Sequence, residues 1–225
     1  MLRLNELARP VSEGCVCILR KRLHEFVLRG QGFLDAPEHK EALHDARVAI
    51  RRVRVWMKLA GDVVGVSERD RHALRDFARE SSPVRDMEVQ LAWLASLQLG
   101  ADERPGQEAL LELMRAGFEN RRHALQESLP KALAGAEHAL KSIHPLDEHD
   151  ESMGAWLAEH WMDVATFMIE DVPHLPENLH AVRLVGKQLR YMLEPVVEAL
   201  GAEDVMQVLR RGQDALGRVN DARVL

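Results

Sequence analysis

Residue types that carry common chemistries are scarce in this chain of 225 residues. It has two cysteines, Cys15 and Cys17, which point in different directions on a helix, so no disulfide between them is expected. Aromatic residues make up 4% of the chain, which disfavours a binder of single-stranded nucleic acid that stacks bases on rings. No apolar run approaches the ~18 residues of a membrane span and no signal peptide is evident. We therefore expect a cytoplasmic protein that has no membrane partner.

Sequence motifs of catalysis are missing as well. There is no HExxH on a helix, no GxSxG turn and no glycine-rich phosphate loop. The histidines do not form sets of metal ligands, because His44 and His180 are each followed by an arginine three residues later and have no second ligand on the same helix face. The sequence therefore predicts no catalytic residue, no metal site and no cofactor.

Charge is distributed unevenly along the chain. The net charge is −6, which disfavours a protein that coats nucleic acid with its whole surface. Residues 43–60 nevertheless carry +4 and residues 179–193 carry +3, so the rest of the chain carries −13. An acidic body with concentrated basic segments is typical of a selective polyanion site, because the body repels random contacts and the segments attract the ligand.

The two basic segments share one pattern. The segment LHDARVAIRRVRVWMKLA at residues 43–60 returns as LHAVRLVGKQLRYML at residues 179–193. On a helix, at about 100° per residue, the histidine and the repeated basic residues of each segment fall within an arc of about 80°. These basic rows consist of His44, Arg47, Arg51, Arg54 and Lys58 in the first segment, and of His180, Arg183, Lys187 and Arg190 in the second. Apolar strips border each row on both sides, so we interpret the rows as the lining of a groove or channel for an anion.

The rest of the sequence predicts an all-α fold. Helices are expected over residues 12–34, 38–60, 67–80, 82–98, 107–127, 130–143, 153–170 and 179–193, with another from residue 202, and no segment predicts a strand. The polar segment 144–151 divides the chain into a first half, 1–143, and a second half, 144–225. An offset of 135 places Leu209 on Leu74, so the repeat extends beyond the basic helix. We expect two helical bundles of the four-helix type, related by this repeat, with a basic groove or pore between them.

Five further charged residues are candidates for a supporting role. Arg20 and Arg22 lie on the first predicted helix and one of them could reach the groove, whereas Arg85 lies beside Asp86 in the motif VRDMEV. Asp221 falls on Asp86 in the repeat. An aspartate beside a basic groove more often holds an arginine in place than acts as a general base, so we expect both aspartates to pair with arginines.

These motifs together closely resemble a known family. The segments LHDARVAIRRVRVWMKLA, VRDMEV, LHAVRLVGKQLRYMLE and GRVNDARVL resemble the two halves of a CHAD domain, the conserved histidine α-helical domain, over nearly the whole chain. The resemblance implies two four-helix bundles about a pseudo-twofold axis and binding of inorganic polyphosphate in a basic central pore, by the nine residues of the two basic rows. Some members associate with polyphosphate granules. Because the family pattern continues where this chain ends, a homodimer or a further C-terminal segment is expected to close the second bundle.

The sequence thus leads to a first hypothesis and two alternatives. The first is a non-catalytic module that binds inorganic polyphosphate and has no specific nucleic-acid partner. The second is an enzyme or regulatory subunit that acts on phosphorylated compounds, with His44 or His180 as an acid–base group. The third is a helical scaffold whose basic rows pair with acidic helices inside the same molecule.

Overall fold

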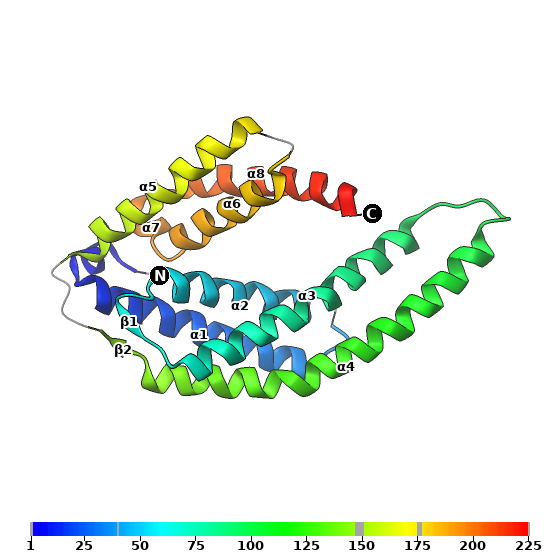
Figure 1. Ribbon diagram of the computed structural model, residues 1–225, viewed down its shortest axis with the longest axis horizontal. Coiled ribbons are helices and arrows are strands. Elements are labelled where there is room, and N and C mark those ends of the chain that lie inside the picture. The colour runs from blue at the N-terminus through cyan, green and yellow to red at the C-terminus, as the bar shows by residue number, and fades with distance from the viewer. Residues whose placement is uncertain (1, 40, 147–150, 175–176, 225) are drawn as a thin grey trace. The chain divides into compact units, whose positions relative to one another are not determined.

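The expected all-α fold is confirmed. The computed structural model describes residues 2–39, 41–146, 151–174 and 177–224, and of these the side chains of 171, 173 and 220–224 are not described. The described residues form eight α-helices, shown in Figure 1. They are α1 (Val11–Asp35), α2 (Ala42–Leu59), α3 (Glu68–Ser96), α4 (Arg104–Ser142), α5 (Met153–Asp171), α6 (Leu179–Leu193), α7 (Val197–Leu200) and α8 (Glu203–Val224). Two 3-10 helices, η1 (Leu4–Ala8) and η2 (Val172–His174), accompany them. Within the described ranges, no helix is both long and apolar enough to cross a bilayer.

A short antiparallel sheet departs from the expectation that the chain has no strands. Strand β1 (Val64–Gly65) pairs with β2 (His144–Pro145), with Val64 opposite Pro145. Two residues per strand are too few to produce the period-two alternation that predicts a strand from sequence. The sheet ties the segment after α2 to the segment after α4.

The chain divides into two compact units. Unit 1 comprises Met1–Lys21, Val55–Gly65 and Ile143–Leu225, and unit 2 comprises Arg22–Arg54 and Val66–Ser142. Helix α1 therefore begins in unit 1 and ends in unit 2, and α2 begins in unit 2 and ends in unit 1. The predicted halves, residues 1–143 and 144–225, were defined by the sequence repeat. The two compact units combine other segments of the chain, so the division into repeated halves stays a prediction.

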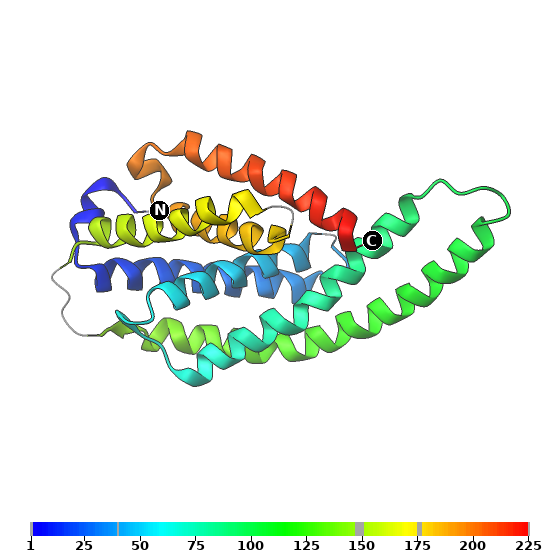
Figure 2. The ribbon, with the colours of Figure 1, turned by 45° about the horizontal axis from the view of Figure 1, so that its top comes forward.

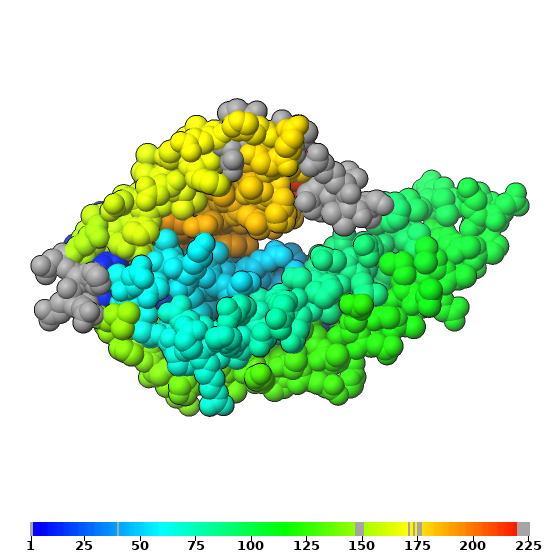
Figure 3. All heavy atoms as spheres, viewed as in Figure 1, coloured from blue at the N-terminus to red at the C-terminus, as the bar shows by residue number. Residues whose placement is uncertain are grey.

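Unit 1 is built around α5, α6 and α8, which lie side by side in Figure 2. Its interior includes Trp56 from the end of α2, whose Nε1–H donates to the carbonyl oxygen of Tyr191 in α6 at 3.0 Å. Main-chain bonds also tie the first residues of the chain into this unit, since the amide of Met153 donates to the carbonyl of Arg9 at 2.8 Å. Helix α5 also has an outer surface, in yellow-green in Figure 3, and leaves the side chains of Phe167 and Ile169 exposed.

Unit 2 contains the long pair α3 and α4, which run side by side in Figure 1. Ser67 caps the start of α3, where its side-chain oxygen accepts a hydrogen bond from the amide of Asp70. The buried carboxylate of Asp70 in turn contacts Nδ1 of His138 in α4 at 2.7 Å. Helix α1 also packs against α3, because Phe26 of α1 lies against Phe77 of α3 with the ring centroids 5.4 Å apart.

Two of the predicted helix breaks are wrong. Helix α3 runs through Pro83 and α4 runs through Pro130. The prediction took Ser82 as the cap of a new helix that has Pro83 in its first turn, and it placed a second break near Ser128 and Pro130. In the structure the hydroxyls of Ser82 and Ser128 instead donate to carbonyls of the preceding turn, those of Ala78 and Leu125. The packing of α3 against α4 over their length outweighs the hydrogen bond that each proline removes.

Two glycines of α1 provide a matched test of its packing. A Cβ atom added at Gly14 would lie 2.7 Å from Cγ and 3.0 Å from Cβ of Met153, whereas one added at Gly32 would meet nothing within 4 Å. We expect Gly14→Ala to lower the free energy of unfolding by about 1–3 kcal/mol, because the buried Met153 must shift. Gly32→Ala is expected to raise it by about 0.5–1 kcal/mol, because alanine loses less backbone entropy. Urea denaturation of both variants checks the prediction, which fails if Gly14→Ala is as stable as Gly32→Ala.

Candidate anion-binding site

The basic row of α2 is held in place by the burial of the helix face behind it. Ala46, Ile50 and Val53 are each at most 1% exposed, as the apolar spacing predicted. Because these side chains fix the rotation of the helix, the arc that carries the histidine and the basic residues is fixed as well.

Exposure differs along the basic row of α2 and increases from Arg47 to Lys58. Arg47 is only 5% exposed, His44 and Arg51 are half-buried, and Arg54 and Lys58 are exposed. The first four of these residues belong to unit 2, and Lys58 lies in the part of α2 that belongs to unit 1. The row therefore offers solvent-facing cations at one end and a desolvated cation near the other, where a bound anion would be attracted more strongly.

Helix α3 adds two arginines to this row. The charge of Arg85 lowers the pKa of both His44 and Arg47, and the charge of Arg75 lowers the pKa of Arg54, so α3 brings both guanidinium groups within electrostatic reach of α2. Loss of solvent is the largest cause of all three shifts. The sequence had indicated Arg85 as a supporting residue and had missed Arg75. A signal was present, because the offset of 135 that places Leu209 on Leu74 also places Arg210 on Arg75.

Arg47 is the most deeply placed cation of the α2 row. Its Nη1 donates to the hydroxyl oxygen of Ser81 at 3.0 Å. Burial, together with the charges of Arg51 and Arg85, lowers the pKa of Arg47 to about 10, and the nearby carboxylate of Asp86 offsets part of that shift. The charge of Asp86 thus acts on Arg47, and the expected pairing of Asp86 with an arginine stays a prediction. Arg47 remains charged at neutral pH in surroundings that disfavour the charge.

The second basic row lies on α6 in unit 1. Val182 and Leu189 are buried behind it, and Leu184, at one border of the row, is half exposed to solvent. The row itself runs from His180, which is exposed, to Arg183, Lys187 and Arg190, which are half-buried.

Unpaired donors accompany the α6 row. The Nε atoms of Arg183 and Arg190 are buried and have no hydrogen-bond partner among the described residues, and the same holds for Nε2 of Gln213 in α8. A Cβ atom added at Gly186 of α6 would lie 3.8 Å from that Nε2, so Gln213 adjoins the α6 row. Buried donors without partners cost free energy, and a phosphate oxygen is an acceptor that would satisfy them. The sequence alone did not indicate Gln213.

The remaining predicted residues have other surroundings. Arg20 donates from Nη2 to the carbonyl of Ile143 at 3.3 Å. Arg22 pairs with Glu25 at 3.1 Å. Asp221 lies in α8, but its side chain is outside the described part of the structure.

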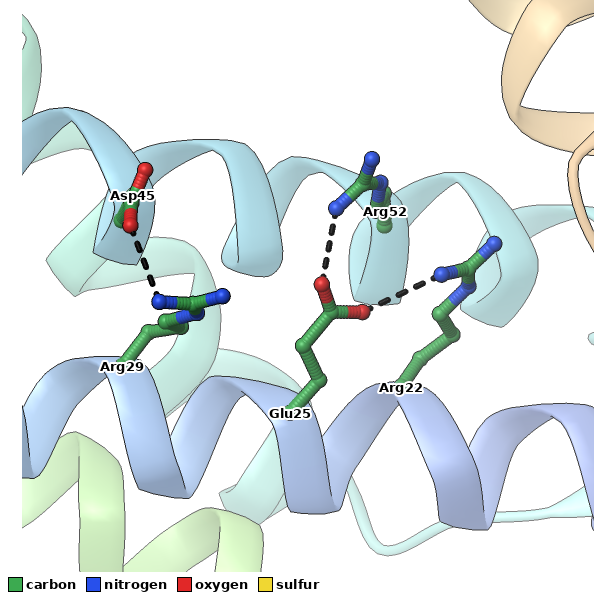
Figure 4. A network of polar contacts seen from close by, with 5 residues as sticks. All are labelled: Arg22, Glu25, Arg29, Asp45 and Arg52. Carbon is green, nitrogen blue, oxygen red and sulfur yellow. Dashed lines mark hydrogen bonds and ion pairs between the residues drawn. The ribbon is translucent and has the colours of Figure 1, made fainter.

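Figure 4 shows that Glu25 also binds Arg52 of α2, while Arg29 of α1 binds Asp45. This network joins α1 to α2, and within it Arg22 makes a structural ion pair with Glu25. Among the supporting candidates, Arg85 and Asp86 are therefore the ones whose charges act on the basic row of α2.

The aromatic residues beside the basic rows are not available for stacking. Trp56 is fully buried and Tyr191 is 3% exposed. The guanidinium carbon of Arg190 lies 4.8 Å from the centre of the Tyr191 ring, so that ring supports a cation. A ligand with bases would find no ring platform on these two residues, whereas a ligand made of phosphates needs none.

Among the described residues, the cysteines and the other metal-ligating residues form no second site. Both cysteines are free thiols. Burial raises the pKa of the Cys15 thiol to about 12, which keeps it protonated and unreactive. In the part of the chain that the structure describes, no three His, Cys, Asp or Glu residues are grouped so that they could hold a metal ion.

Comparisons with known proteins give a consistent result. The CHAD domain family model matches residues 17–225. A crystal structure of the CHAD domain from the plant Ricinus communis has the same fold, with a TM-score of 0.75 and 22% sequence identity, and the match covers 98% of this chain and 79% of that one. No curated protein matches the sequence. Since the family model extends over most of the chain and includes both basic rows, the chain belongs to the CHAD domain family.

Proposed function

We propose that this chain binds inorganic polyphosphate without hydrolysing it, in the cytoplasm or at polyphosphate granules. The ligand contacts are the basic row of α2, with Arg75 and Arg85 of α3, and the basic row of α6. These two surfaces are described separately, each within its part of the chain, and a long linear polyanion needs only to reach both of them.

The observation that carries this proposal is the excess of positive charge around α2, which remains although Arg85 pairs with Glu88. The pKa values of His44, Arg47 and Arg54 are all lowered, and neighbouring arginines contribute to each shift. Carboxylates that balanced these charges would act in the opposite direction, and here they offset only part of the shifts. The negative charge of a bound polyanion would raise all three pKa values and so offset the part of the shifts that comes from neighbouring arginines, which favours binding at this surface.

The chemistry of the rows favours phosphate over nucleic acid. Arginine side chains supply forked donors that match phosphate oxygens, and the aromatic residues of the two basic helices, Trp56 and Tyr191, are buried and cannot stack bases.

A competition titration tests the proposal. Labelled long-chain polyphosphate is bound to the full chain at fixed salt, and unlabelled polyphosphate or single-stranded DNA is added as competitor, matched by phosphate concentration. We expect polyphosphate to compete at least about tenfold better, and the affinity to fall with salt as released counterions require. Equal competition by DNA would overturn the proposal. Phosphate release by the wild type that His44→Ala abolishes would instead establish an enzyme.

Binding is expected to depend on pH through His44. In the free protein its pKa lies below the ordinary 6.5 because of desolvation and the charge of Arg85, so the ring is neutral at pH 7. A bound polyanion favours the protonated ring and raises this pKa. Binding therefore takes up a proton, and affinity rises as the pH falls below about 6.5.

The matched variants are His44→Gln and, as control, His123→Gln on the exposed surface of α4. We expect the ratio of wild-type to His44→Gln affinity to be roughly fivefold larger at pH 5.5 than at pH 8, measured at constant ionic strength. The His123→Gln variant should follow the wild type at both pH values. A ratio for His44→Gln that does not change with pH would remove His44 from the ligand surface.

A further inference from the structure

Three buried hydrogen-bond donors gather where α8 packs against α6, and both helices belong to unit 1. They are Nε of Arg183, Nε of Arg190 and Nε2 of Gln213, and none of them has a hydrogen-bond partner among the described residues. All three groups are donors, so they cannot satisfy one another. Each costs free energy of folding as long as no acceptor reaches it. A ligand that carries several acceptors would satisfy the group.

Gly186 lies at the centre of these donors. At about 100° per residue, Arg183, Gly186 and Arg190 fall within an arc of about 60° on α6, and Gly186 is about one turn from each arginine. A Cβ atom added at Gly186 would have Nε2 of Gln213 as its nearest neighbour, at 3.8 Å. The amide of Gln213 therefore lies beside the stretch of α6 that separates the two arginines.

The packing of α8 directs Gln213 toward α6. Met206 precedes Gln213 by one heptad and falls within about 20° of it around the helix. Met206 is 3% exposed, so the face that it shares with Gln213 is the buried face of α8. An apolar side chain would be the ordinary occupant of such a position.

The first copy of the repeat has apolar residues at the corresponding positions. In the register of the basic rows Gly186 falls on Ile50, and in the register that places Leu209 on Leu74, Gln213 falls on Ala78. Ile50 and Ala78 are both buried. The first copy thus has a large apolar residue on its basic helix and a small one on the next long helix. The second copy has a glycine and a long amide instead, an exchange that packing alone does not require.

The three donors are within reach of a ligand. Arg183, Arg190 and Gln213 are each half-buried, so part of every side chain already meets solvent. Changes of side-chain rotamer at partly exposed positions are fast, and they can turn a buried nitrogen toward the surface. The side chains that carry the unpaired donors therefore border the same surface as the basic row of α6.

We propose that Gln213 is a further ligand-binding residue, which donates from Nε2 to a phosphoryl oxygen that Arg183 and Arg190 also bind. This inference rests on the proposed binding of polyphosphate and adds a neutral donor from α8 to the cations of α6. Because the amide carries no charge, its contact with phosphate releases no counterion. Its contribution to affinity therefore does not decrease as salt is added, unlike that of each arginine.

The first test compares Gln213→Met with Gln207→Met, which makes the same change at an exposed position of the same helix. Binding of long-chain polyphosphate to the full-length variants is measured at fixed salt. We expect Gln213→Met to weaken binding about tenfold, because a hydrogen bond to a charged acceptor is lost, and Gln207→Met to bind within about twofold of the wild type. Equal affinities of the two variants would overturn the inference.

The salt dependence separates a neutral donor from a cation. Gln213→Met should keep the wild-type slope of log affinity against log salt, whereas Arg183→Gln should have a slope shallower by about 0.7. Gln213→Lys keeps a donor and adds a charge, so it should bind at least as tightly as the wild type, with a slope steeper by about 0.7. A Gln213→Lys variant that binds as weakly as Gln213→Met would contradict a direct contact with the ligand.

Thermal unfolding in the absence of polyphosphate distinguishes a ligand residue from a structural one. Gln213→Met removes an unpaired buried donor, so we expect its melting temperature to rise by about 2–4 °C. A lower melting temperature would mean that the amide bonds to the protein itself, for example by accepting from an arginine after rotation, and would overturn the inference. Failure of the wild type to bind polyphosphate would overturn the proposed function, and this inference with it, whereas wild-type binding that Gln213→Met leaves intact overturns the inference alone.

Discussion

Reversing the charge of Arg51 and Lys187 together is expected to weaken the binding of long-chain polyphosphate at least about 100-fold at 0.1 M salt, where charges within about 10 Å are incompletely screened. Each substitution to glutamate removes a cation and places an anion against the phosphates, once on the α2 surface and once on α6. Arg51 stands where the charges are most concentrated, because it also lowers the pKa of its neighbours Arg47 and Arg54.

The salt dependence gives a second readout of the same variant. Each lost phosphate contact with a single-stranded polyanion reduces the slope of log affinity against log salt by about 0.7, so the double variant should have a slope shallower by about 1.4. The control is Arg9→Glu with Arg121→Glu, which changes the net charge equally at exposed positions on other elements. If the control loses as much affinity as Arg51→Glu/Lys187→Glu, binding depends on net charge and the two basic rows are not the site.

Arg47→Met is expected to make the protein more stable and a weaker binder. Arg47 is 5% exposed, and its pKa of about 10 means that the folded protein disfavours its charge at every pH below that value. Replacing it by methionine, which fills the space of the aliphatic stem, is expected to raise the free energy of unfolding by about 1–3 kcal/mol. For a chain of this size that corresponds to a rise in melting temperature of roughly 2–4 °C per kcal/mol.

The Arg47→Met substitution is also expected to weaken the binding of polyphosphate. Removing this desolvated cation should lower polyphosphate affinity by about tenfold, whereas Arg47→Lys, which keeps the charge but loses the forked donor, should lose less. Ser81 keeps a partner in the Met variant, since its hydroxyl also donates to the carbonyl of Ala78. Thermal unfolding by circular dichroism, with and without polyphosphate, measures both effects. Destabilisation by Arg47→Met would mean that its charge is already compensated in the free protein.

Local periodicity predicted the helices of the basic rows because each has a buried apolar face. The spacing of Ala46, Ile50 and Val53 gave the orientation of α2, and Val182 and Leu189 did the same for α6. The predicted helix 179–193 agrees with α6 at both ends, and the predicted helix 38–60 begins before α2 does. Burial of one face constrains residues three and four apart, so a single sequence carries this information.

The predicted breaks at Pro83 and Pro130 are wrong because the competing contribution is tertiary. A serine close before a proline is a good local signal for a helix start, and nothing within a few residues shows that α3 and α4 pack against each other. The same reason explains why Arg75 was missed. Its effect on Arg54 depends on where α3 lies beside α2, which no periodicity within either helix specifies.

The sequence by itself determined the all-α class, the family resemblance and the membership of each basic row, since all three depend on spacings of three to seven residues along one helix. Only the tertiary structure decided how each cation is used. Burial and neighbouring charge, which come from helices distant in sequence, separate Arg47, desolvated and held by Ser81, from the exposed Lys58 of the same row. They also reveal the unpaired donor of Gln213 beside α6. The free energy of a charge depends on all the groups around it, whereas the face on which it lies depends only on its own helix.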